Sequence, residues 1–392
     1  MLKTGLKISK LNELNKIRKL LSPYTKRAYI VGGSVRDMLL SEIKSSKKNI
    51  KFRQKAIDFD IEIYDIKPAK FDVLMNENGA SGVGKSYFVY KFGNFDLSLP
   101  RTESKVGKGH KAFEVSYCND EREASRRRDF TVNSIMINIF SGEILDFNGG
   151  INDLKKGVLR HIDDEKFCED SLRVLRAIQF SARLNFMVAP KTLKLMKTLR
   201  LNDLSKDRIA AELLKLFRAK FQHTAAAYLH ELGLFKTLFG LNLSKFEVEA
   251  FGSKLAKAIK FKKDEREFLY LLAGMFGLKE PILKELNLPN SFKSCFTQPF
   301  FIGRVSDKEL LEISLKMPLK DWLGLNSATL IKRAKKFGVY DKKFDAQIDS
   351  IAVIKDGFKN ERIGAEILRR QRQEIEKFLE NFKAQNSKQK PI

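Results

Sequence analysis

The stretch AYIVGGSVRDMLL, residues 28–40, decides how the first part of the chain folds. Its apolar run predicts a buried strand, and the glycine pair that follows predicts a tight turn. The residues after the turn predict a short helix through Met38, Leu39 and Leu40. A phosphate group could sit on a glycine turn of this kind.

Within the turn, Gly32 and Gly33 allow the backbone to approach a triphosphate closely because they lack side chains. Ser34 can donate a hydrogen bond to a phosphate, and Arg36 can bind one through two parallel N–H groups. The alternative is an ordinary strand-to-helix turn in which Arg36 and Asp37 form a surface ion pair. Taken alone, the segment leaves both interpretations open.

A second strand is predicted over IDFDIEIY, residues 57–64, because apolar and acidic residues alternate there. Residues at i and i+2 of a strand project from the same face, so Asp58, Asp60 and Glu62 share one face. The oxygens of Asp58 and Asp60 can converge on a pair of divalent cations, and Mg²⁺ prefers such ligands together with substrate phosphates. Beside a phosphate-binding turn, the pair indicates phosphoryl transfer. The alternative is a strand whose exposed face happens to be acidic.

Outside these two stretches, the sequence pattern changes near Asn148. Strands predicted over 87–92, 95–99 and 135–140 favour an α/β or α+β first domain, and helical periodicity takes over after Asn148. Between the glycine turn and the second strand, the lysine- and serine-rich residues 41–55 predict a mobile loop. Candidate helices in the second part cover residues 168–184, 191–199, 207–219, 223–233, 246–260 and 361–383.

The charge of the chain points to a polyanionic partner. Lysine and arginine total 74 in 392 residues against 48 aspartates and glutamates, which gives a formal net charge of +26. Nucleic acid is the first candidate. No apolar run approaches the roughly 20 residues that a spanning helix needs. Because the N-terminal residues lack a secretory signal pattern and the three cysteines lie far apart, we expect a cytoplasmic protein.

One segment matches a known phosphate-binding pattern, but its flanking residues do not fit that pattern. GASGVGKS, residues 79–86, matches a phosphate-binding P-loop, which requires a buried strand before it and a helix after it. The preceding NENG is polar, and the following YFVYKFGNFDLSL reads as β structure. We therefore expect no P-loop, and an ATPase that depends on Lys85 is the least favoured interpretation of the function.

Six motifs follow one another in an order that resembles the class II tRNA nucleotidyltransferase and bacterial poly(A) polymerase family. They are VGGSVRD (31–37), DFD (58–60), RTE (101–103), RRDFTVN (127–133), LDFNGGINDL (145–154) and EDSLRVLRAIQF (169–180). The resemblance implies an α+β fold with a polymerase-beta-type nucleotidyltransferase head followed by an all-helical neck, body and tail. The expected bounds are 1–148 for the head, 149–222 for a neck that selects nucleotides and binds RNA, and 223–392 for a body and tail that bind tRNA.

The resemblance also implies roles for particular residues. Asp58 and Asp60 would be catalytic carboxylates and metal ligands, and Asp96 would activate the primer hydroxyl. The expected nucleotide-binding residues are Gly32, Gly33, Arg36, Arg128, Asp129, Asp170, Arg173 and Arg176. Among them, Asp170 and Arg173 would read the base as a protein template. At helical spacing Asp170, Arg173 and Arg176 form a ridge, which a solvated ion pair alone would also explain.

Two positions depart from the family pattern. Gln179 stands where relatives usually carry an arginine, and Ser171 stands where many carry a proline. Because Gln179 drifts toward the apolar side of its predicted helix, one nucleotide contact is expected to be weaker or supplied from elsewhere.

The reaction implied by the resemblance is the addition of CCA to the 3′-end of tRNA from CTP and ATP, with Mg²⁺ as cofactor and release of pyrophosphate. The expected partners are tRNA, ATP and CTP, with no membrane and no obligate protein partner. A poly(A) polymerase or a partial CC- or A-adding enzyme on the same scaffold is the first alternative. A non-catalytic RNA-binding protein with a degenerate head is the second, and the intact Asp58, Asp60 and Arg128 argue against it.

Overall fold

The structure, a computed structural model, describes residues 12–48, 59–84, 88–105, 113–261 and 264–387. The chain divides into two compact units, one that ends at Leu213 and one that begins at Leu214. No helix in these described ranges is long and apolar enough to cross a membrane.

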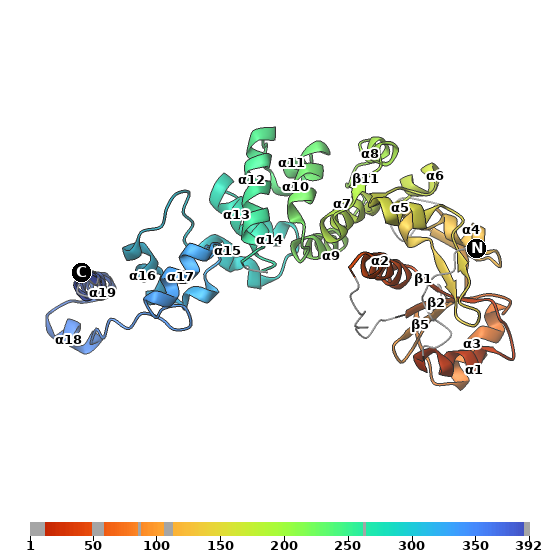
Figure 1. The fold of residues 1–392 in the computed structure, drawn as a ribbon, viewed down its shortest axis with the longest axis horizontal. Helices are drawn as coiled ribbons and strands as arrows, with labels where there is room; N and C mark the ends of the chain where they lie inside the picture. Colours follow the sequence, from red (N-terminus) through yellow and green to blue (C-terminus); the bar gives the residue numbers. More distant parts are fainter. Residues whose placement is uncertain (1–11, 49–58, 85–87, 106–112, 262–263, 388–392) are drawn as a thin grey trace. The chain divides into compact units, whose positions relative to one another are not determined.

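Unit 1 is built on a seven-stranded mixed sheet (Figure 1). All neighbouring strands pair antiparallel except β2 and β5, which run parallel. Parallel strands need a crossover connection, and this one contains α3 (Pro68–Glu77) and the β3–β4 hairpin. The strand order is β3 (Ser81–Gly84), β4 (Val89–Phe92), β5 (Phe95–Ser98), β2 (Phe59–Ile63), β1 (Ala28–Val31), β8 (Met136–Asn138) and β9 (Ile144–Leu145).

The centre of this sheet is buried on both faces. Every residue of β1 is buried, and Asp60 is the one exposed residue of β2. On one face the rings of Tyr29 and Tyr64 meet edge to face at 5.6 Å and pack with Ala124 of α4 (Glu121–Arg126). Burial of aromatic and branched side chains on both faces explains why β1 reads as a continuous apolar run in the sequence.

Short helices and two small sheets complete unit 1. The strands β6 (Arg101–Lys105) and β7 (Phe113–Tyr117) pair with each other, as do β10 (Val158–Leu159) and β11 (Met187–Val188). The remaining helices are α1 (Asn15–Leu21), α2 (Gly33–Lys48), α5 (Gly150–Lys156), α6 (Asp164–Cys168), α7 (Leu172–Leu184), α8 (Pro190–Met196) and α9 (Lys206–Phe217), of which α9 crosses into unit 2.

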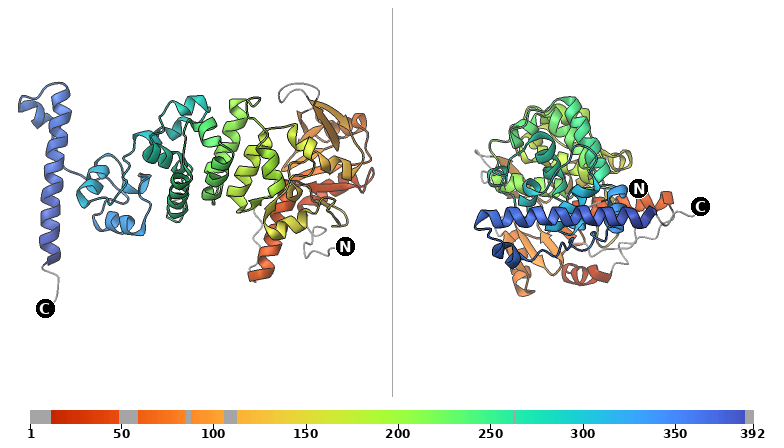
Figure 2. Two further views of the ribbon diagram at one scale, coloured as in Figure 1. Left: turned by 90° about the horizontal axis from the view of Figure 1, so that it is seen from above. Right: turned by 90° about the vertical axis from the view of Figure 1, so that its left-hand side faces the viewer.

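In the described residues of unit 2, every regular element is a helix. Trp322 is only 1% exposed at the centre of one apolar cluster, and its Nε1 donates to the carbonyl of Pro299 at 2.9 Å. The last helix, blue in Figure 2, is a single long helix. The α-helices are α10 (Gln222–Glu231), α11 (Leu234–Phe239), α12 (Lys245–Ala258), α13 (Glu267–Phe276), α14 (Ile282–Glu285), α15 (Ser294–Thr297), α16 (Asp307–Lys316), α17 (Ala328–Lys336), α18 (Ser350–Lys355) and α19 (Glu361–Ser387).

The predicted strands at the sheet centre and most of the predicted helices are confirmed. Three expectations were wrong. Part of the predicted loop 41–55 is helical, because α2 continues to Lys48 without a glycine or proline to end it. The helix predicted over 168–184 is interrupted at residues 169–171. After Asn148, β structure does not vanish, since β10 and β11 form a short parallel pair.

The residues with P-loop spelling form no P-loop where the structure describes them. They follow helix α3, and Ser81–Gly84 form strand β3, which pairs antiparallel with β4. Lys85 lies outside the described residues, as does Asp58. The predicted bounds at 148 and 222 stay predictions, since compactness divides the chain at another position.

Candidate active site

A pocket of about 690 Å³ in unit 1 gathers residues from five of the six sequence motifs. Eight arginines line it against four aspartates, so its charge suits a polyphosphate. The lining residues are Gly32, Gly33, Ser34, Arg36, Asp37, Asp60, Arg101, Arg127, Arg128, Asp129, Asn133, Asp170, Leu172, Arg173, Arg176, Phe180, Arg183 and Arg208. All eight predicted nucleotide-binding residues are among them, together with Asp60.

The glycine turn joins β1 to α2 at one wall of the pocket. Gly32 has a φ of +72°, a left-handed conformation that glycine adopts without strain. Arg36 is only 3% exposed, and its Nη1 donates to Oδ1 of Asn133 at 2.8 Å. Ser34 was expected to donate to a phosphate, but its hydroxyl donates to the carbonyl of Val31 at 3.1 Å. The turn therefore offers backbone N–H groups at a helix N-terminus and one firmly held guanidinium group.

Two carboxylates lie side by side on neighbouring strands. Asp60 of β2 pairs in register with Asp96 of the parallel strand β5. In-register residues of a parallel pair project from the same face, and the strands lie about 4.8 Å apart. Asp60 is exposed and lines the pocket, whereas Asp96 does not line it and lies 3.2 Å from Nζ of Lys91. The structure thus brings Asp60 and Asp96 together, although Asp58 cannot be placed beside them.

The motif RRDFTVN places charged groups between the sheet and α7. Arg128 lies with its Nη2 3.0 Å from Glu62 and donates through Nη1 to the carbonyl of Asn133 at 3.2 Å. Oδ2 of Asp129 lies 2.6 Å from Nη2 of Arg176. Burial alone would raise the pKa of Asp129, but the charge of Arg176 and hydrogen bonds from Asn133 and Arg176 outweigh it and lower the pKa. Asp129 is therefore a carboxylate that anchors Arg176.

Asp170 was predicted to belong to a helical ridge, and this expectation was wrong. It precedes α7, and its Oδ1 accepts from the backbone N–H of Leu172 at 3.1 Å. Aspartate is favoured ahead of a helix because it satisfies an otherwise unpaired N–H group there. The carboxylate of Asp170 also accepts two contacts from Nη2 of Arg208, at 2.8 and 3.1 Å.

The other two residues of the predicted ridge do lie on α7. Arg173 donates to the backbone carbonyls of Lys166 and Arg127, at 2.8 and 2.6 Å. Arg176 also lies with its guanidinium carbon 5.3 Å from the ring centre of Phe180. Each guanidinium group is thus held by contacts within unit 1 before any nucleotide arrives.

Gln179, the position that departs from the family pattern, does not line the pocket. It is only 1% exposed, and its Oε1 accepts no hydrogen bond. The position therefore lies on the buried side of α7, as its helical spacing predicted.

Five arginine and aromatic residues that were not predicted to bind nucleotide also line the pocket: Arg101, Arg127, Phe180, Arg183 and Arg208. Arg101 and Arg127 lie within two of the six motifs, so their place in the sequence could have indicated a role in binding. Arg183 lies on α7 one helical turn beyond Phe180, which spacing could have indicated. Arg208 comes from α9, and no local pattern pairs it with Asp170.

The mixed sheet, with carboxylates on two adjacent strands beside the glycine turn, has the fold of a polymerase-beta-type head domain. Residues 28–160 match the family described as Poly A polymerase head domain, and residues 185–243 match the family described as Probable RNA and SrmB- binding site of polymerase A. The two matched segments follow one another along the chain in that order.

Curated relatives carry the name Multifunctional CCA protein. That of Xylella fastidiosa (strain M23) is 37% identical over 217 residues, which cover 53% of this chain and 47% of the relative. That of Nitrosococcus oceani is 39% identical over 175 residues, covering 44% of this chain and 39% of the relative. These alignments span about half or less of the curated relatives' length.

Solved structures share the fold over most of the chain. The CCA-adding enzyme of Bacillus stearothermophilus in complex with CTP has a TM-score of 0.64 at 23% identity and covers 91% of this chain and 90% of its own. A tRNA nucleotidyltransferase complexed with a primer tRNA and an incoming ATP analog has a TM-score of 0.59 at 22% identity, with 82% and 96% covered. At this identity the likeness shows the fold alone.

Proposed function

We propose that this chain is a template-independent RNA nucleotidyltransferase that adds CCA to the 3′-end of tRNA from CTP and ATP and releases pyrophosphate. The observation that carries the proposal is that the glycine turn, Asp60, Arg128 and the α7 residues meet in one pocket of unit 1. The names of the curated relatives and the ligands of the similar solved structures support the same substrates.

The cationic groups of the pocket suit the binding of a nucleoside triphosphate. Gly32, Gly33 and Arg36 lie at one wall, where backbone N–H groups and a guanidinium would contact phosphate oxygens. Asp170 and Arg173 would receive the base, since a carboxylate accepts from the amino group of cytosine or adenine and a guanidinium donates to acceptors. Arg208 donates to the carboxylate of Asp170, and this hydrogen bond would have to break before Asp170 accepts from the base.

Nucleotidyltransferases of this family generally use a divalent metal ion, and we propose Mg²⁺ with Asp58 and Asp60 as its ligands. The exposed carboxylate of Asp60, beside Asp96 in register, fits a hard cation that prefers oxygen ligands. When bound, the ion would supply charge neutralisation at the phosphates and activation of the primer hydroxyl. Asp96 would accept the proton of that hydroxyl.

We further propose the bounds 1–148 for the head, 149–222 for the neck and 223–392 for a tRNA-binding body and tail, and a cytoplasmic location. The helical character of the described residues of unit 2 and the net charge of +26 support an RNA-binding role for the second part.

Incubation of the protein with tRNA lacking its CCA end, Mg²⁺, and CTP, ATP or both tests the activity. We expect two C residues and one A, with incorporation abolished in Asp58→Ala/Asp60→Ala. The control variant Glu77→Ala/Glu143→Ala removes two exposed acids of unit 1 that lie outside the pocket, and it should retain activity. A long A tail would assign the chain to the poly(A) polymerases, and tRNA binding without incorporation would refute the enzyme proposal.

A further inference from the structure

Glu62 is a buried acid of unit 1 to which the proposed reaction gives no role. It lies on β2 two residues after Asp60 but is only 1% exposed. Its Oε1 accepts from Nη2 of Arg127 at 2.8 Å and lies 3.0 Å from Nη2 of Arg128. A carboxylate is costly to bury unless charged partners compensate it, and here two consecutive arginines do so.

Both arginines line the pocket, but Glu62 itself does not. Arg128 has a side chain only 10% exposed, so its guanidinium group has few other positions available. Two adjacent guanidinium groups in a partly buried place repel each other unless an anion lies between them. Glu62 supplies that anion from the rigid centre of the sheet.

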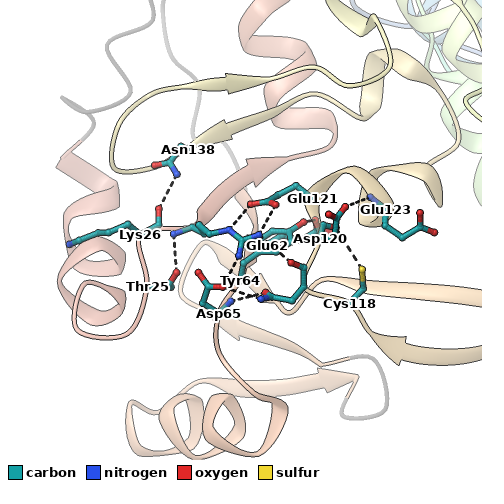
Figure 3. Close-up of polar contacts among 12 residues, drawn as sticks. Thr25, Lys26, Glu62, Tyr64, Asp65, Cys118, Asp120, Glu121, Glu123 and Asn138 are labelled. Carbon is teal, nitrogen blue, oxygen red and sulfur yellow. Dashed lines mark hydrogen bonds and ion pairs between the residues drawn. The ribbon is translucent and has the colours of Figure 1, made fainter.

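The segment that carries these arginines is also fixed at its other end. Arg27 donates to both carboxylate oxygens of Glu121, the first residue of α4, at 2.9 and 2.6 Å, and to Asp65 at 2.6 Å. Figure 3 shows Asp65 and Glu121, with Glu62 and Tyr64 beside them. Helix α4 ends at Arg126, directly before the arginine pair. Arg27, directly before β1, therefore holds α4 at its start, and Glu62 of β2 holds the arginines that follow its end.

We propose that Glu62 is a positioning residue of the nucleotide site, which holds Arg128 in the pocket in the orientation that receives the triphosphate. The inference rests on the proposed nucleotide site. Glu62 acts through the arginines and does not touch the substrate, and it therefore governs nucleotide affinity without taking part in the chemistry.

The geometry distinguishes the variants of Glu62 from one another. Oε1 receives both arginines, whereas Oε2 accepts from the hydroxyl of Tyr64 at 3.2 Å. Glutamine keeps one oxygen for the arginines, and a hydroxyl can turn to accept from its amide group. The triphosphate of a bound nucleotide would then supply the missing negative charge. Methionine keeps the volume but removes every acceptor, so both guanidinium groups lose their contact with residue 62.

Equilibrium binding of CTP in the presence of Mg²⁺, followed by calorimetry on the full chain, tests the proposal. We expect Glu62→Met to weaken CTP binding at least about tenfold and Glu62→Gln to stay within about threefold of the wild type, which correspond to about 1.4 and 0.7 kcal/mol. Glu267→Met is the matched control, because Glu267 is also 1% exposed but lies in unit 2. It should leave CTP affinity unchanged, because the pocket lies in unit 1.

CTP affinity unchanged in Glu62→Met would overturn the proposal, as would equal losses in Glu62→Met and Glu62→Gln. If Glu62→Met does not fold, Glu62→Asp replaces it, since it withdraws the carboxylate by one methylene; it should weaken CTP binding severalfold, and wild-type affinity would again overturn the proposal. A wild-type protein that binds no CTP would instead contradict the proposed function, so the two failures are distinguishable.

Discussion

At the scale of single residues, the pocket is a set of arginines held by acids. Asp129 holds Arg176, Glu62 holds Arg127 and Arg128, and Asp170 contacts Arg208. Cationic groups that are already fixed lose little conformational freedom when an anionic substrate binds, so more of the interaction energy appears as affinity. The acids around the pocket thus stabilise unit 1 and hold the arginines in position for an anionic substrate.

Asp129 gives a pH-dependent prediction. Its pKa is lowered in the folded state, so its charge stabilises the fold at neutral pH and that contribution is lost as the pH falls through the folded pKa. We expect Asp129→Asn to lower the free energy of unfolding by about 3 kcal/mol at pH 7, because Arg176 loses its buried partner. The difference between wild type and variant should shrink below pH about 3.9, the ordinary value for aspartate. Urea unfolding at pH 7 and at pH 3.5 measures it, and a difference that grows in acid would contradict this account.

Two helical glycines should respond oppositely to alanine. A Cβ at Gly150, the first residue of α5, would lie 2.2 Å from the backbone carbonyl oxygen of Thr131, so Gly150→Ala requires a backbone shift. A Cβ at Gly364 in α19 would meet nothing within 4 Å. We expect Gly150→Ala to destabilise the protein by about 2 kcal/mol or more, and Gly364→Ala to be neutral or stabilising by up to about 1 kcal/mol. Thermal unfolding of both variants measures the two changes in stability, and equal changes would refute the steric explanation.

At the scale of helices and strands, apolar periodicity predicted the elements whose formation depends on local sequence. The strands around the glycine turn and helices such as α9, α10 and α12 follow directly from apolar spacing. The helix break at residues 169–171 was not predicted, because it depends on side chains that satisfy the first N–H groups of α7 and on a hydrogen bond from Ser171 to Asp203 at 2.6 Å. Helix boundaries of this kind are set by tertiary partners.

The motifs of the candidate site could be predicted from the sequence, but the ion pairs between them could not. Glu62 shares the sequence alternation of Asp60, yet one is buried and the other exposed, because the arginines that cover Glu62 lie 65 and 66 positions further along the chain. The contact between Asp170 and Arg208 likewise joins the segment before α7 to α9, 38 positions further along the chain. Charge partners across such separations leave no periodic signal in a single sequence.

Helix α7 carries a prediction of its own at Gln179. The side chain is buried and its Oε1 accepts no hydrogen bond, which costs about 1–3 kcal/mol for a polar group removed from water. We expect Gln179→Met, a change of similar volume, to raise the free energy of unfolding by about 1 kcal/mol. Catalytic activity should stay near that of the wild type, because Gln179 does not line the pocket. Chemical denaturation measures the change, and a loss of stability would show that the amide has a compensating partner in solution.

At the scale of the whole molecule, the chain combines a compact unit that contains the pocket with a second unit whose described residues are helical. The formal net charge of +26 far exceeds what eight pocket arginines can explain. This surplus of positive charge supports the proposed binding of tRNA, a polyanion much larger than a nucleotide.

This excess charge predicts a steep salt dependence of tRNA binding. Each phosphate neutralised by a lysine or arginine releases counterions, so affinity falls as salt rises. We expect the dissociation constant for tRNA to rise by about tenfold or more between about 50 and 200 mM KCl, as for proteins with several phosphate contacts. Filter binding at four salt concentrations measures the slope. An affinity that stays constant over this range would exclude an interface dominated by phosphate contacts.

The parallel pairing of β2 with β5 has a consequence for changes of chain length. Asp60 and Asp96 are matched by strand register, although 35 residues that include α3 and the β3–β4 hairpin separate them in the sequence. That crossover could gain or lose residues in its turns without moving either carboxylate. A deletion of one codon inside β5 would instead turn Asp96 to the opposite face of the sheet. In a library of in-frame insertions and deletions selected for activity, we thus expect single-codon changes to be retained in the turns of the crossover and lost from β5.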